Sequence, residues 1–124
     1  MAHILVVDDE QQVRLMLRKK LEAEGHHVSV ASEGGEALGI VKENPIEVAI
    51  TDLLMPGKDG LETIIDLRRD HPGVMIIAIS GGGVGSPNIY LDAALRLGAH
   101  RTFSKPIALE TLFKATRELV SSRS

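Results

Sequence analysis

The 124-residue chain has no cysteine, no tryptophan and only three residues with aromatic side chains of the Phe, Tyr or Trp type, Phe103, Phe113 and Tyr90. The absence of cysteine excludes disulfides, thiolate nucleophiles and cysteine-based zinc or iron–sulfur sites. So few aromatic rings leave little for stacking on the bases of a nucleic acid. The core must therefore be built from aliphatic side chains, which supply most of the 44% of residues that are hydrophobic.

Long hydrophobic runs and an excess of basic residues are also missing. No apolar stretch approaches the roughly 18 residues of a transmembrane helix, and the start lacks the basic and then apolar regions of a signal peptide. The net charge is −3, and the basic residues are scattered instead of forming the stripe that a nucleic-acid surface needs. We therefore expect no membrane insertion, no direct nucleic-acid binding and a cytoplasmic location.

Short runs rich in Val and Ile alternate with longer segments of helical period, which is typical of repeated βα units. The length suits one domain, residues 1–124, with no room for a second. We expect an α/β fold with a doubly wound, five-stranded parallel sheet and helices on both faces. The expected strands are 3–7, 27–31, 47–51, 74–79 and 101–104.

Breakers and caps indicate where the helices begin and end. Gly25 and Gly98 are placed to end the first and fourth helices, and the second must stop before Pro45. Asp59 with Glu62 predicts an N-cap for the third helix, and Ser86 with Pro87 for the fourth. In the first helix we expect an apolar face of Val13, Met16, Leu17 and Leu21, and a solvated side of Arg14, Arg18, Lys19 and Lys20. The last helix should fray over residues 121–124.

Chemically unusual residues follow four of the five apolar runs: Asp8 and Asp9, Asp52, Ser80, and Lys105. The carboxyl ends of parallel strands share one edge of a sheet, which is where open α/β sheets bind ligands. Spacing alone does not define the strand order. If the first and third strands are neighbours, as in the flavodoxin-like order 2-1-3-4-5, the three aspartates converge.

A cluster of carboxylates requires a cation, because like charges about 4 Å apart cost on the order of 4 kcal/mol at an effective dielectric of about 20. Oxygen ligands in this number suit Mg²⁺, which takes one or two protein carboxylates together with waters and a phosphate. With charge on the phosphoryl oxygens neutralised by the metal and by Lys105, a carboxylate can attack phosphorus. The predicted edge is therefore a cation site beside a phosphate site.

The motifs together resemble the receiver domain of bacterial two-component response regulators, and the resemblance covers the whole chain. Each motif alone is weak, but the four in this order are highly specific. The matching segments are Asp8-Asp9-Glu10, Asp52-Leu53-Leu54-Met55-Pro56-Gly57 with Asp59-Gly60, Ser80-Gly81, and Gly98-Ala99 with Lys105-Pro106.

The resemblance implies a role for each residue. Asp52 would take a phosphoryl group from a histidine of a partner kinase or phosphotransfer protein, and Lys105 would pair with that group. Ser80 would move toward it as the conformational switch, which would alter contacts with an unknown downstream protein. The metal would be Mg²⁺, held by Asp8, Asp9, Asp52 and the Leu54 carbonyl. The bond between Lys105 and Pro106 would be cis, as is typical of the family.

One position departs from the family pattern, because receivers of this kind usually have Tyr or Phe three residues before the lysine. Here that residue is Thr102, and Phe103 should face the other side of the sheet by strand alternation. We therefore expect output to run mainly through residues 81–85 and the fourth helix. Two further residues bear on the lifetime of the phosphoryl group. Apolar Leu54 would shield the acyl phosphate from water, whereas Gly82 would leave the other side open. These effects oppose each other, so we do not predict whether the lifetime is long or short.

Several features also have simpler interpretations. Aspartates after a strand are often only helix caps, and Ser80 alone is as easily structural. The glycine-rich stretch 81–85 lacks the spacing of a phosphate-binding loop, so it is interpreted as a mobile loop. The five histidines show no metal-ligand spacing and are expected at the surface or at strand edges.

Two other functions compete with the receiver. An aspartyl phosphohydrolase using Mg²⁺ would need an acid where Leu54 stands, and no cap domain is present to enclose a substrate. A pseudo-receiver that only binds proteins would not need the full set of acids with Ser80 and Lys105. The receiver is therefore the favoured function, as a non-enzymatic switch with no effector domain in this chain and as a monomer or weak dimer.

Overall fold

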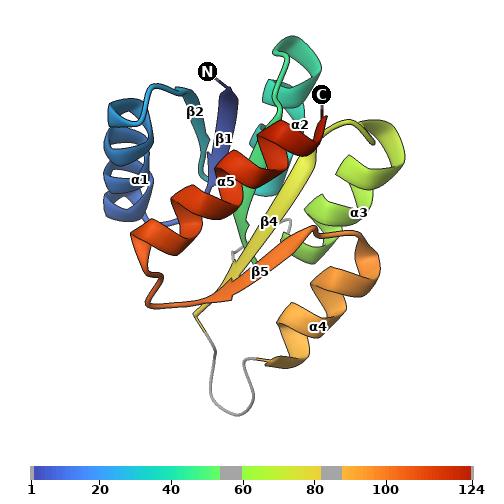
Figure 1. The fold of residues 1–124 in the computed structure, drawn as a ribbon. Helices are drawn as coiled ribbons and strands as arrows, with labels where there is room; N and C mark the ends of the chain where they lie inside the picture. The colour runs from blue at the N-terminus through green and yellow to red at the C-terminus, as the bar shows by residue number, and fades with distance from the viewer. Residues whose placement is uncertain (1, 54–59, 82–87, 124) are drawn as a thin grey trace.

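The computed structural model describes residues 2–53, 60–81 and 88–123. Its centre is a parallel sheet with strands in the order β2-β1-β3-β4-β5 (Figure 1). The strands are β1 (His3–Val7), β2 (His27–Ala31), β3 (Val48–Asp52), β4 (Met75–Ser80) and β5 (Arg101–Ser104). The order confirms the predicted flavodoxin-like sheet, and each strand lies within one residue of its predicted bounds.

The helices cover both faces of the sheet, also as predicted. They are α1 (Gln11–Ala23), α2 (Gly34–Glu43), α3 (Gly60–Asp70), α4 (Asn88–Leu97) and α5 (Leu109–Arg123). One face carries α1 and α5, and the other carries α2, α3 and α4 (Figure 1). In the part of the chain that the structure describes, no helix is long and apolar enough to span a membrane.

Two separate aliphatic cores lie above and below the sheet, because alternate residues of each strand point to opposite faces. Along β1, Ile4 and Val6 pack toward α1 and α5, whereas Leu5 and Val7 pack toward α2 and α3. The central strands are buried on both faces, which explains why β4 is apolar as far as Ile79 and why even Thr51 and Asp52 at the end of β3 are buried. The sheet edge that carries the polar residues is thus held rigidly from two sides.

Glycine ends two of the helices as predicted. Gly25 after α1 has φ 96°, and Gly98 after α4 has φ 123°, both in the left-handed region that favours glycine. The predicted caps at Asp59 and at Ser86 with Pro87 lie outside the described residues.

Two predictions about the helices are wrong. The chain does not fray at Ser121, because α5 continues to Arg123, whose Nε donates to the Gly73 carbonyl at 2.8 Å and whose Nη1 pairs with Glu47 at 3.2 Å. These contacts anchor the last turn to the amino-terminal edge of the sheet. Met16 is not part of a buried face, since the residue is 41% exposed, and Leu15 beside it is 52% exposed.

Candidate functional site

The side chain of Lys105 joins the carboxyl ends of β1, β3 and β5. Its Nζ lies 3.3 Å from Asp8 Oδ2 and 3.2 Å from Asp52 Oδ2. Both carboxylates are almost fully buried, with Asp8 4% and Asp52 5% exposed. Residues far apart in the sequence are thus brought together where strand pairing predicted they would meet.

The charges at this edge do not balance. Burial by itself lowers the pKa of Lys105, but the carboxylates of Asp52 and Asp8 outweigh it and raise that pKa above its ordinary value. The lysine is therefore fully protonated at neutral pH. One ammonium faces two buried carboxylates, so the site retains negative charge that a further cation would neutralise.

Asp8 is fixed by its backbone as well as by its side chain. Its N–H donates to the Ala31 carbonyl at 3.1 Å, and its Oδ1 accepts the Glu10 N–H at 2.9 Å. The Asp8 carbonyl accepts Nη1 of Arg14 at 2.7 Å. Arg14 is half-buried by this contact, so its predicted place on the solvated side of the first helix is wrong.

Oxygen ligands gather beside Asp8. One carboxylate oxygen each from Asp8, Asp9 and Glu10 lie within 4.8 Å of one another, and Asp9 and Glu10 are exposed to incoming ions. Glu10 Oε1 is also 3.9 Å from Lys105 Nζ. A hard, partly open, all-oxygen set of this kind fits Mg²⁺ better than a nitrogen- or sulfur-preferring metal.

Asp52 is held against the start of α3. Its strand pairs with β4, and the next residue, Leu53, donates its N–H to the Ile79 carbonyl at 2.9 Å. Gly60 donates to the Leu53 carbonyl at 3.2 Å, and a Cβ at Gly60 would overlap the Asp52 carbonyl oxygen. Only glycine allows the first turn of α3 to approach Asp52 this closely.

Ser80 and Lys105 are connected through the ends of β4 and β5. Ser80 is fully buried, and its carbonyl accepts the Lys105 N–H at 2.9 Å. The bond between Lys105 and Pro106 is cis, as expected. The predicted Leu54 ligand, and Gly82 beyond the serine, lie outside the described residues.

The orientation of β5 confirms the prediction about Thr102 and Phe103. Thr102 pairs with Ala78, which belongs to the core under α3 and α4. Phe103 pairs with Ile79 and packs into the opposite core, under α1 and α5. The position that faces α4 therefore carries a small hydroxyl side chain and no ring.

A mostly apolar groove of about 600 Å³ opens beside the site. It runs between α1 and the segment that leads from β5 into α5, and Lys105 forms one end of its wall. The exposed Met16 lies on its rim. The lining residues are Val13, Met16, Leu17, Gly81, Lys105, Pro106, Ile107 and Leu109.

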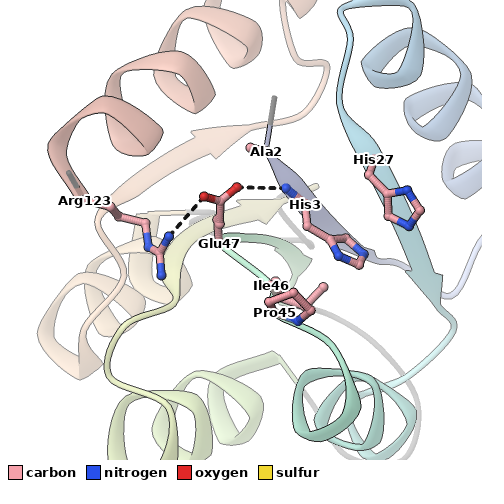
Figure 2. Close-up of a pocket in the computed structure, with 7 residues that line it drawn as sticks. All are labelled: Ala2, His3, His27, Pro45, Ile46, Glu47 and Arg123. Atoms are coloured by element: carbon pink, nitrogen blue, oxygen red, sulfur yellow. Dashed lines mark hydrogen bonds and ion pairs between the residues drawn. The ribbon is translucent and has the colours of Figure 1, made fainter.

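A second cavity, of about 470 Å³, lies at the opposite end of the sheet, where the strands begin (Figure 2). Glu47 links the two sides of it, since it accepts the His3 N–H at 2.9 Å and pairs with Arg123. The ring centroids of His3 and His27 are 4.3 Å apart, and His3 Nε2 is 2.8 Å from Ser29 Oγ. Within the described ranges, no histidine joins a cluster of three or more potential metal ligands.

Three contributors to the site carry only weak signals in the sequence. Glu10 was visible only as the residue after Asp9, Arg14 as one of several basic residues, and Gly60 as a part of a motif. The signal for Glu10 is adjacency to two acids, and for Arg14 it is a place one turn into the helix that follows them. Neither signal distinguishes a site residue from a solvated one without the fold.

Known proteins resemble this chain over nearly its full length. Residues 4–117 match the model of the response regulator receiver domain. The response regulator MprA of Mycobacterium sp. (strain KMS) is 36% identical over 121 residues, which are 98% of this chain and 51% of that protein. The chain thus spans about half the length of the curated relatives it matches.

Solved structures agree with this result. A receiver domain protein from Clostridium thermocellum superposes with a TM-score of 0.92 at 30% identity, covering 99% of this chain and 97% of that one. The beryllofluoride-activated receiver domain dimer of NtrC4 gives a TM-score of 0.88 at 30% identity, with both chains fully covered. By its fold and by the family model that spans it, the chain belongs to the receiver domains of two-component response regulators.

Proposed function

We propose that residues 1–124 act as a phosphoacceptor receiver, with Asp52 as the residue that is phosphorylated. The donor is a phosphohistidine of a histidine kinase or of a histidine phosphotransfer protein. A carboxylate oxygen of Asp52 attacks phosphorus and forms a new P–O bond. The P–N bond to the donor imidazole breaks, and its electron pair stays on the ring nitrogen, which then takes a proton.

The observation that carries this proposal is the position of Lys105 between two nearly buried carboxylates, 3.3 Å from Asp8 and 3.2 Å from Asp52. An ammonium at this point neutralises charge on phosphoryl oxygens bound to Asp52. Ser80, at the neighbouring strand end, is proposed to turn toward the same oxygens and so report the phosphorylated state.

Mg²⁺ is the proposed cofactor, held by Asp8, Asp9, Asp52 and the carbonyl of Leu54. When bound, the ion supplies positive charge to the phosphoryl oxygens during transfer. Support comes from the all-oxygen donor set at Asp8, Asp9 and Glu10 and from the unbalanced charge around Lys105. In the transfer itself, Asp52 provides the nucleophile and Lys105 provides a fixed positive charge. The buried ends of the strands exclude water.

Incubation with acetyl phosphate and MgCl₂ tests the function and its competitors. The proposal predicts that the protein gains the mass of one phosphoryl group and that Asp52→Asn gains none. Continuous release of phosphate without stored mass would instead indicate an aspartyl phosphohydrolase. If the protein neither gains mass nor releases phosphate, the chain is instead a pseudo-receiver that only binds proteins.

The groove beside Lys105 is the proposed surface for the histidine-bearing partner. Exposed Leu15 and Met16 on α1 offer apolar contact next to the acceptor. Arg18, Lys19 and Lys20 on the same helix are exposed and favour an acidic rim on that partner. We further propose a cytoplasmic monomer or weak dimer that switches contacts with a downstream protein and does not itself bind nucleic acid.

A further inference from the structure

Asp8 is the most constrained residue of the acidic cluster. Arg14 binds its backbone carbonyl, which lies beyond the last pair of residues in the strand. The N–H of Asp8 still bonds to β2, but its carbonyl lies past the last strand pair, at the turn into α1. That carbonyl accepts Arg14 Nη1 at 2.7 Å, a short charge-assisted hydrogen bond from a half-buried side chain. The chain therefore leaves the strand with its direction fixed by a residue on the helix it is about to form.

The start of α1 needs such a contact. Its N-cap residue, Glu10, makes no side-chain capping bond, and the first turn contains no acidic residue. Asp8 Oδ1, bonded to the Glu10 N–H at 2.9 Å, and Arg14 on the Asp8 carbonyl are the contacts that brace this turn. Three carboxylates within 4.8 Å repel one another, and an unbraced turn would spread to separate them.

We propose that Arg14 is a positioning residue for the divalent-cation site, acting through the carbonyl of Asp8. It keeps the carboxylates of Asp8, Asp9 and Glu10 facing one another before any ion arrives. This inference rests on the proposed binding of Mg²⁺. It assigns Arg14 no contact with the ion or with the phosphoryl group.

Charge and position predict opposite effects when Arg14 is removed, which makes the inference sharply testable. If Arg14 acted only as a nearby positive charge, its loss would tighten the binding of a cation. If Arg14 braces the turn, its loss weakens that binding. Supporting residues of metal sites typically contribute 10- to 100-fold in affinity, and lost repulsion offsets part of this, so we expect about tenfold.

The experiment is a titration of the ¹⁵N-labelled chain with MgCl₂, followed by the amide signals of residues 8–10 and 52. Arg14→Gln is expected to raise the Mg²⁺ Kd about tenfold, and Arg14→Lys, which keeps the charge and one donor, to raise it less. Without metal, the amides of Asp9 and Glu10 in Arg14→Gln are expected to exchange with solvent faster than in the wild type. The matched control is Arg18→Gln, one turn further along α1, where the guanidinium pairs with exposed Glu22 at 3.3 Å.

An unchanged or lower Kd in Arg14→Gln, with wild-type binding intact, overturns the inference and leaves the proposed function standing. Failure of the wild type to bind Mg²⁺ overturns the proposed function itself. If Arg14→Gln loses its dispersed amide spectrum, Arg14→Lys decides, since a Kd equal to that of the wild type in this variant also contradicts the inference.

Discussion

Lys105 carries one positive charge against two buried carboxylates, and this imbalance bears on the stability of the site and on its proposed chemistry. The lysine lies within 3.3 Å of Asp8 and 3.2 Å of Asp52, with a quarter of its side chain exposed. Removing one partner of a fully buried ion pair costs about 3–5 kcal/mol, because the other charge is left uncompensated. Partial exposure of the lysine reduces that cost.

Replacing Lys105 with Met is therefore expected to lower the free energy of unfolding by about 1–3 kcal/mol in metal-free buffer. Added Mg²⁺ should restore most of this loss, because the ion neutralises the same carboxylates, while phosphorylation stays defective. Urea denaturation with and without MgCl₂ measures the effect, and Lys42→Met, an exposed lysine on α2, serves as the control. A variant as stable as the wild type without metal would contradict the assigned role of Lys105.

A substitution at Gly60 tests how closely the start of α3 packs against the backbone of Asp52. A methyl group there would overlap the Asp52 carbonyl oxygen and lie 2.5 Å from the Leu53 Cα, so Gly60→Ala must displace the segment that carries Asp52. We expect a loss of about 1–3 kcal/mol in unfolding free energy, together with slower phosphorylation by acetyl phosphate.

Gly39→Ala is the matched control for that substitution. Gly39 lies inside α2, and an added Cβ there meets nothing within 4 Å. Alanine should thus stabilise the chain by about 0.5–1 kcal/mol. Equal effects of the two substitutions would mean that Gly60 is not a close-contact position.

Three partly buried histidines are expected to make the free energy of unfolding depend on pH. Burial, and then the charges of Arg68 and Arg101, lower the pKa of His100, whose Nδ1 accepts the Ile76 N–H at 2.9 Å. Burial also lowers the pKa of His26 and of His3. The unfolded chain therefore binds more protons than the folded one as the pH drops below about 6.5.

Stability from these histidines is complete above the unfolded pKa of about 6.5 and is lost as the pH falls toward the lower folded values. Urea denaturation at pH 7.5 and 5.5 should show a decrease, and His100→Asn, whose side-chain oxygen can still accept the Ile76 N–H, should show a smaller one. A pH dependence identical to that of the wild type in His100→Asn would exclude His100 as a cause.

At the scale of elements, the residues of β5 bear on the proposed output route from the site. Thr102 faces the core under α3 and α4, where the family usually has an aromatic ring, and Phe103 faces α5 instead. A threonine cannot swing between two large pockets as a ring does. Coupling from Ser80 toward β5 and α5 should therefore be weak.

Amide hydrogen exchange with and without beryllofluoride checks this route. We expect the changed protection in residues 81–85 and in α4, with little change in β5 and α5. The variant Thr102→Tyr should extend the response into β5. Changes confined to β5 and α5 in the wild type would contradict this output route.

The sequence predicted most elements because pattern and packing agree in them. Strands β3 and β4 are buried along nearly their whole length because both faces of the sheet are covered, and Gly25 and Gly98 stop helices where a positive φ is required. The failures occur where a single long side chain reaches a distant backbone. Arg14 bonds to the Asp8 carbonyl and Arg123 to the Gly73 carbonyl, and neither contact leaves a periodic signal.

The positions of the site residues could likewise be predicted only in part. Strand order brought Asp8, Asp52 and Lys105 together, since parallel strands place their carboxyl ends at one edge. The contributions of Glu10 and Gly60 depend on distances of a few ångströms, which strand order does not determine. Met16 was expected in the core and is exposed because α1 presents it to the groove beside Lys105.

At the scale of the whole molecule, the two cores make the acidic edge a rigid platform. Helices α1 and α5 cover one face of the sheet and α2 to α4 the other (Figure 1), and the site lies at the carboxyl ends of β1, β3 and β5. The opposite edge, with Glu47 and Arg123, ties α5 to the sheet (Figure 2). Because the sheet is held at both ends of its strands, we expect the movement of the proposed switch to be confined to the segments around Asp52.

The central claim is that Asp52, and no other carboxylate of the cluster, accepts the phosphoryl group. The most direct test is to phosphorylate the chain with acetyl phosphate and Mg²⁺, reduce the acyl phosphate with borohydride and locate the modified residue by tandem mass spectrometry. The account predicts modification at Asp52 alone, in both the wild type and Asp9→Asn at raised Mg²⁺. Modification at Asp8, Asp9 or Glu10, or no modified residue at all, would contradict it.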